Sequence, residues 1–73
     1  MAEQAEELKK LIDIATDMDL SPELRTRATK QMGRINTHEA LRALLDLAAN
    51  EKLTRAEREL AIKHARDIIK ASR

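Results

Sequence analysis

The sequence contains no cysteine, no aromatic residue, and only one glycine and one proline among its 73 residues. Without cysteine there is no disulfide framework and no indication of a redox compartment. Without aromatic side chains, the core must consist of Leu, Ile, Ala and Met, and the stacking platforms that many nucleic-acid binders use are missing. Valine is also absent, so strands have no support. The composition predicts an all-α protein.

The chain also lacks an excess of charge of one sign and a long apolar run. It has 14 basic and 13 acidic residues, for a net charge of +1. No apolar run approaches the roughly 18 residues that a membrane span needs. The first ten residues are polar and helical in pattern, unlike a signal peptide. We expect no membrane partner and a cytoplasmic location. If the protein is designed, we expect it to exist only as a recombinant protein.

Signatures of catalysis and of metal binding are missing from the sequence. There is no glycine-rich phosphate loop, and Ser21 fits a helix cap better than a nucleophile elbow. His38 and His64 are not at metal-ligand spacing. We expect His38 to be exposed beside a cap, and His64 to be partly buried and hydrogen-bonded. The sequence therefore predicts no enzyme activity, no catalytic or cofactor-binding residue, no metal site and no cofactor.

What the chain does contain is a repeat of itself. When residues 6–35 are laid over residues 39–68, ten of the thirty positions are identical, whereas chance would give roughly three. A fixed period of this length indicates a repeated supersecondary unit. The identical positions are Glu6/Glu39, Leu8/Leu41, Leu11/Leu44, Asp13/Asp46, Ala15/Ala48, Leu20/Leu53, Arg25/Arg58, Ala28/Ala61, Lys30/Lys63 and Ile35/Ile68.

Apolar spacing and capping residues predict four helices. Ser21 followed by Pro22 is a helix start, and Thr54 with Glu57 forms a capping box. Either Asn36 or Thr37 can cap the third helix. The helices are expected over residues 2–17, over 22–35, from about 37 to before the break at Asn50, and over 55–71.

These helices form two hairpins, residues 2–35 and 36–71, within a single domain of residues 1–73. Solenoids usually need three or more repeats, because each unit buries its apolar face only on neighbours. We therefore expect the two hairpins to close on each other as a compact four-helix domain rather than to bury that face in an oligomer. Leu20 and Leu53 are expected to close the open end of each hairpin, Met18 and Met32 to fill the core, and Gly33 to mark close packing or a helix end.

The stretch from Asp17 to Leu45 resembles HEAT-like repeats of the phycobilisome-lyase type. That family shows an acidic turn, an apolar residue followed by Arg, an Ala three residues later, and a Leu-Gly-x-Ile helix end. The corresponding residues here are Leu24-Arg25, Ala28 and Met32-Gly-Arg-Ile35. The second hairpin departs from this pattern, because Glu57 precedes Arg58 where the family has an apolar residue.

The resemblance implies stacked helical hairpins whose second helices line a concave side. It also implies contacts from Arg25 and Arg58 to acids such as Asp13 and Asp46. Most such proteins serve as scaffolds or protein-binding modules, and a minority bind nucleic acid along a basic concave face.

Charge alternates between the predicted helices. Residues 2–19 and 37–53 carry net charges of −4 and −1, whereas residues 22–35 and 55–73 each carry +3. The basic residues form two one-sided stripes, which are either a binding face or solvated charge paired with the acidic helices. This candidate basic face comprises Arg27, Lys30, Arg34, Lys63, Arg66 and Lys70. Ile14, Leu47 and Ile62 fall outside the main apolar stripes, so they either widen the buried face or form a candidate exposed apolar patch.

Three hypotheses for function follow. The first is a non-enzymatic structural or protein-interaction module, with a protein partner or self-association through the apolar patch. The second is a designed or engineered helical protein with no natural activity, which dense capping and abundant helix formers favour. The third is binding of nucleic acid or an acidic partner by the basic face, which the near-zero net charge and the missing aromatic residues disfavour.

Overall fold

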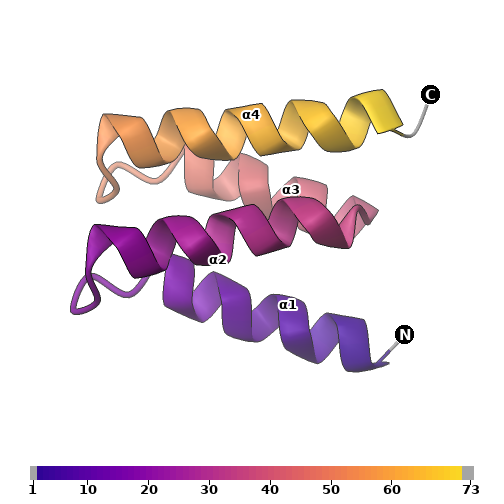
Figure 1. Cartoon of the computed structure of the whole chain (residues 1–73), viewed down its shortest axis with the longest axis horizontal. Coiled ribbons are helices and arrows are strands. Elements are labelled where there is room, and N and C mark those ends of the chain that lie inside the picture. Colours follow the sequence, from indigo (N-terminus) through magenta and orange to yellow (C-terminus); the bar gives the residue numbers. More distant parts are fainter. Residues whose placement is uncertain (1, 72–73) are drawn as a thin grey trace.

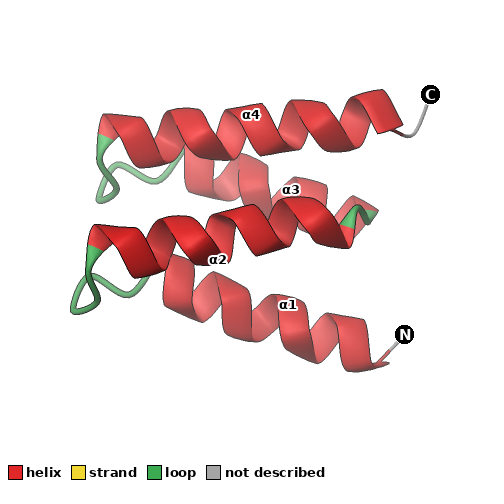
Figure 2. Ribbon diagram, viewed as in Figure 1, coloured by secondary structure: helices red, strands yellow, loops and turns green. Residues whose placement is uncertain are grey.

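Three of the four helices begin directly after a predicted capping residue, namely Ser21, Thr37 and Thr54. The computed structural model describes residues 2–71, with side chains from residue 5 onward. Its helices are α1 (Ala2–Ala15), α2 (Pro22–Ile35), α3 (His38–Ala48) and α4 (Arg55–Ala71), joined by short loops (Figure 2). The predicted fold class, an all-α domain of four helices, is confirmed. The first helix ends at Ala15, two residues before the prediction.

Side-chain caps and one left-handed residue set the helix ends. The Ser21 hydroxyl accepts a hydrogen bond from the Leu24 amide at 3.3 Å. Thr37, not Asn36, caps α3, and its hydroxyl accepts from the Ala40 amide at 3.1 Å. Asn36 instead ends α2 in the left-handed conformation, with φ 56° and ψ 42°, a conformation that Asn tolerates.

The residue 33 positions after Asn36 is Ile69, and α4 passes through it without a break to Ala71. A β-branched side chain is strongly disfavoured in the left-handed conformation. Without a residue that adopts that conformation, α4 extends beyond the position at which α2 stops.

The loops within the two hairpins repeat the same hydrogen bonds with the period of 33. The Asp17 carboxylate accepts from the Asp19 amide at 2.9 Å, and the Asn50 side-chain oxygen accepts from the Lys52 amide at 2.9 Å. In both loops the amide three residues after the Asx residue, in Leu20 and Leu53, donates to its carbonyl at 3.1 Å. Both loops lie at the same end of the molecule (Figure 2). The sequence repeat is therefore a structural repeat.

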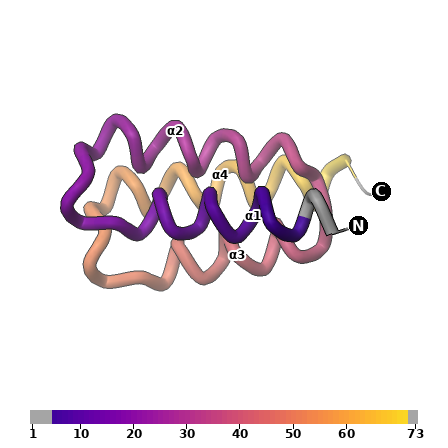
Figure 3. The backbone as a smooth tube through the Cα atoms, turned by 90° about the horizontal axis from the view of Figure 1, so that it is seen from below, coloured from indigo at the N-terminus to yellow at the C-terminus, as the bar shows by residue number. Residues whose placement is uncertain are grey.

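The two hairpins lie one on the other. In the described residues α1 packs on α2 and α3 on α4, α2 also contacts α3 and α4, and α1 and α4 do not contact each other. Figure 1 shows α2 and α4 running in the same direction in front of α1 and α3. In Figure 3, which views the molecule from below, α2 lies along one edge, α3 lies along the opposite edge, and α1 and α4 lie between them. The radius of gyration of 11.2 Å matches the value of about 11 Å expected for a compact globule of this length.

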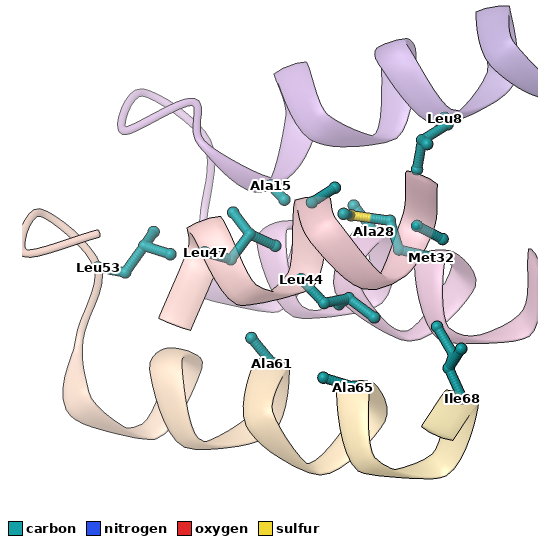
Figure 4. Packing of buried hydrophobic residues seen from close by; sticks show 12 residues of the cluster. Leu8, Ala15, Ala28, Met32, Leu44, Leu47, Leu53, Ala61, Ala65 and Ile68 are labelled. Atoms are coloured by element: carbon teal, nitrogen blue, oxygen red, sulfur yellow. The ribbon is translucent and has the colours of Figure 1, made fainter. Parts of the chain in front are cut away.

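The core lies between the hairpins and is entirely aliphatic apart from one methionine. Figure 4 shows Leu44 and Leu47 of α3 between the side chains of α1 and those of α4. Met32 and Leu44 are completely buried. The buried apolar residues are Leu8, Ala15, Ala28, Met32, Ala40, Ala43, Leu44, Leu47, Leu53, Ala61, Ala65 and Ile68.

Of the predicted core and loop residues, one is placed wrongly. Leu53 is buried and Leu20 is partly buried, so both loops contribute an apolar side chain. The prediction that Met32 fills the core is confirmed, but the same prediction for Met18 is wrong, because Met18 is 42 % exposed. Met18 lies in the loop between α1 and α2 and points to solvent there.

Gly33 of α2 lies directly against His64 of α4. A Cβ atom at this position would lie 3.0 Å from His64 Cβ and 2.8 Å from His64 Nδ1. We expect Gly33→Ala to destabilise the protein by up to about 2 kcal/mol, because the crowding costs roughly 1–3 kcal/mol and the helix propensity that alanine adds recovers only roughly 1 kcal/mol. Urea unfolding measures the change, and a more stable variant would contradict this close approach.

Candidate functional site

A buried ion pair joins the two hairpins. Arg25 of α2 donates from Nε to Glu57 Oε2 at 3.0 Å and from a terminal nitrogen to Glu57 Oε1 at 2.9 Å. Its other terminal nitrogen donates to the Leu20 carbonyl at 2.6 Å. Thr54 caps α4 by accepting from the Glu57 amide, and its hydroxyl donates to Glu57 Oε1. Arg25 thus links the loop of the first hairpin to the first turn of α4.

Both members of the pair are held in their charged forms. The hydrogen bond from Arg25 is the main cause that lowers the pKa of Glu57, with burial opposing it. The same hydrogen bond raises the pKa of Arg25 above its usual value. A guanidinium and a carboxylate in bidentate contact are matched in geometry and in charge. The pair therefore fixes how one hairpin lies on the other.

The partner of Arg25 differs from the one implied by the family resemblance. The resemblance suggested Asp13, which lies on α1 and is exposed, whereas the guanidinium contacts Glu57, 32 residues away. Glu57 is also the residue that departs from the family pattern. The equivalent position of the first hairpin holds the apolar Leu24, whereas Glu57 makes an ion pair across the hairpin interface.

Arg58, the repeat equivalent of Arg25, has no such partner in the described part of the chain. Its Nε atom is buried and makes no hydrogen bond there. Asp46, the acid suggested for it, is exposed. A buried guanidinium nitrogen without an acceptor is costly, so Arg58 is a polar group that still needs a partner.

Exposed apolar side chains lie on the outward side of each hairpin. On the first hairpin, Ile14 and Leu24 are 38 % and 43 % exposed. They line an open hollow of about 280 Å³ whose other lining residues are Leu11, Arg27, Ala28 and Gln31. We call this surface the first outer face.

On the second hairpin, Leu45 and Ile62 are 49 % and 40 % exposed. Ile62 lines an open hollow of about 410 Å³ together with Ala48, Arg58 and two charged residues of α4. Leu45 precedes Ala48 by three residues and shares its side of α3. We call the surface formed by Leu45, Ala48, Arg58 and Ile62 the second outer face.

The predicted apolar patch does not form as one surface. Ile14 and Ile62 are exposed, but they belong to the two outer faces, on helices α1 and α4 that do not contact each other. Leu47 is 2 % exposed, so its assignment to an exposed patch is wrong. Ile14 occupies the same position in the first hairpin as Leu47 does in the second. Leu47 is buried because the other hairpin packs against it, whereas no hairpin covers Ile14.

The six residues of the candidate basic face are all exposed, but they are divided among different surfaces. Lys30 and Lys63 both act electrostatically on His64 and therefore lie near one point between α2 and α4. Arg27 lines the hollow of the first outer face. Lys63 and Arg66 line a hollow with Glu59 and Ile62 on α4. Arg34 and Lys70 are exposed near the ends of their helices, and the basic face stays a prediction.

The two histidines differ in their surroundings. His38 is exposed, as predicted. The His64 side chain is 18 % exposed, with Nδ1 3.8 Å from an Asp67 oxygen. Its Nε2 is buried and has no hydrogen-bond partner in the described residues, so only the partial burial predicted for His64 is confirmed. Burial lowers the pKa of His64, assisted by Lys63 and Lys30, while Asp67 opposes the shift.

The depressed pKa of His64 makes stability depend on pH. The unfolded state binds the proton more readily, so the free energy of unfolding falls as pH decreases below the ordinary value of 6.5. We expect it to fall again below 4.5, because the unfolded state then binds a proton at Glu57, whereas the lowered pKa in the native state keeps this carboxylate charged. Urea titrations at several pH values measure both steps. His64→Gln should remove the first step, whereas His38→Gln should leave it unchanged, and persistence of the first step in His64→Gln would contradict the assignment.

No group of three or more metal-ligating side chains occurs in the part of the chain that the structure describes. None of the described helices is long and apolar enough to cross a membrane. In comparisons of the chain with protein families, curated proteins and solved structures, nothing matches. The structure shows a four-helix all-α domain, and the resemblance to HEAT-like repeats stays a prediction.

Proposed function

We propose that this protein is a non-enzymatic module of two HEAT-like helical hairpins that binds other proteins through its outer faces. The observation that supports this most is the placement of exposed aliphatic side chains. Among the residues whose side chains are described, six large apolar residues are exposed, and four of them lie on the outer faces: Ile14, Leu24, Leu45 and Ile62. An apolar surface next to a hollow, bordered by charged residues, is typical of a protein-binding site.

Two further features support binding of protein rather than of nucleic acid. The exposed basic residues are spread over several surfaces, and acidic Glu59 and Asp67 lie among them. No aromatic side chain is available to stack on a base. Helical ligands suit the outer faces best, because each face is a shallow surface between two helices.

A displayed library of helical peptides, selected against the full chain, tests the proposal. The selected peptides should bind an outer face, so Ile14→Lys or Ile62→Lys should abolish binding of the peptides that use that face. Lys30→Glu is the control, because Lys30 is exposed and lines none of the hollows described above, and this substitution should leave binding intact. A library that yields no binder, or binders that depend on Lys30 and not on either isoleucine, would contradict the proposal.

A further inference from the structure

The second hairpin covers one side of the first. This contact shows how a neighbouring hairpin packs against a hairpin of this repeat. The repeat then shows which surface of the second hairpin corresponds to the covered one. A shift of 33 converts Ile12, Ala15, Arg25 and Thr29 into Leu45, Ala48, Arg58 and Ile62, which are the residues of the second outer face.

The first set is more deeply buried than the second, in which Leu45 and Ile62 are exposed and Ala48 and Arg58 are partly buried. Arg25, Thr29 and Ala15 are 7 %, 5 % and 1 % exposed, and Ile12 is partly buried against the core. Their equivalents Leu45 and Ile62 are 49 % and 40 % exposed. Ile62 is also more apolar than Thr29, so the uncovered surface is at least as well suited to packing as the covered one.

The unpaired Arg58 indicates what chemistry the missing neighbour supplies. Arg25 receives a carboxylate from the capping box of the neighbouring hairpin, where Thr54 and Glu57 begin α4. Arg58 occupies the equivalent place, and its Nε is buried without an acceptor in the described residues. A carboxylate at the start of an incoming helix would satisfy it in the same geometry.

A second copy of this chain does not supply that carboxylate. If the first hairpin of another copy took the place of the missing neighbour, Leu24 would occupy the position of Glu57 and face Arg58. In addition, Glu7 and Lys10 would occupy the positions of Ala40 and Ala43, which are 0 % and 9 % exposed. Burying two charges and leaving the guanidinium unpaired disfavours this contact.

We therefore propose that the second outer face binds a helical hairpin of a partner protein whose second helix begins with a Ser/Thr-x-x-Glu capping box. The glutamate pairs with Arg58, and small residues on the partner's first helix allow close approach to Leu45 and Ala48. This inference rests on the proposed function, because it names the partner class for one of the two outer faces.

The test lengthens the full chain by a third hairpin. The added segment is a copy of residues 36–71, which contains the required capping box, joined after Arg73 by a flexible Gly-Ser linker of about ten residues, which spans roughly 17 Å. If the copy docks, the urea m-value should rise by about half, because m scales with the surface exposed on unfolding. The matched control is an added copy of residues 2–35, which carries Leu24 at the critical position and should leave the m-value unchanged.

The role of Arg58 is tested in the same lengthened chain. Glu57→Gln in the added copy should lower the urea midpoint, Arg58→Gln should lower it similarly, and the two together should lower it by less than the sum. An unchanged m-value overturns the docking of a hairpin at this face. Equal midpoints with Glu and Gln overturn the pairing with Arg58, and docking of the 2–35 copy instead would show that a second molecule of this chain is the partner. None of these results decides the proposed function, which the peptide selection tests on both outer faces.

Discussion

Replacing Glu57 by alanine is expected to destabilise the protein by about 3 kcal/mol, since removal of one member of a buried ion pair typically costs roughly 3–5 kcal/mol. The loss arises because Arg25 stays buried, with its Nε and one terminal nitrogen deprived of their acceptor. The same substitution removes the capping-box carboxylate that Thr54 contacts. A chain of 73 residues has a total stability of roughly 4–11 kcal/mol, so this one change removes a large part of it.

Thermal unfolding followed by circular dichroism measures the effect, with an expected decrease in Tm of about 15 °C or more. The control is Glu59→Ala, on the same helix. Glu59 lies 4.0 Å from Arg55, and both side chains are largely exposed, so its loss should change the stability by at most about 0.5 kcal/mol. Equal effects of the two substitutions would contradict the structural role of the buried pair.

Truncating Leu44 to alanine is expected to destabilise the protein by about 3 kcal/mol as well. Leu44 is completely buried in α3, between the two hairpins. The substitution removes three carbon atoms from the centre of a small aliphatic core and leaves a cavity, for which losses of roughly 2–5 kcal/mol are usual. The chain has no aromatic side chains. The core therefore holds no large side chain that could move into the cavity.

The adjacent Leu45 is a matched control with the same side chain. It is 49 % exposed, so Leu45→Ala should cost less than about 1 kcal/mol. Urea unfolding of both variants measures the difference. Similar losses at the two positions would mean that α3 is rotated relative to the orientation described above.

The helix bounds could be predicted from the sequence because local chemistry sets them. Ser21, Thr37 and Thr54 each accept a hydrogen bond from the amide three residues later, and this needs no knowledge of the tertiary structure. The choice between Asn36 and Thr37 stayed open, because both residue types cap helices. The structure assigns the cap to Thr37, and Asn36 adopts the left-handed conformation at the end of α2.

The hairpin interface could not be predicted in the same way. The 33-residue repeat gives Ile14 and Leu47 the same position in a hairpin, yet one is 38 % and the other 2 % exposed. Periodicity identifies a face of a helix, but it does not say which hairpin has a neighbour on that face. Leu47 was assigned to an exposed patch for this reason.

The partner of Arg25 was missed although the sequence held a signal for it. Glu57 replaces an apolar residue of the repeat and follows Arg25 by 32 positions. Within a stack of period 33, that separation brings the two side chains to neighbouring positions on adjacent hairpins. The Arg25–Glu57 pair can be predicted from this separation only if the hairpins are known to stack in register, and that is information about the tertiary structure.

The claim on which the account depends is that Arg25 and Glu57 hold the two hairpins in register. A double-mutant cycle with Arg25→Met, Glu57→Leu and the double variant tests it most directly by urea unfolding. We expect each single variant to be strongly destabilised and the double variant to recover much of the loss, with a coupling free energy of about 2 kcal/mol or more, because apolar residues of similar size replace a buried ion pair well. Single-variant losses that simply add in the double variant would contradict the account.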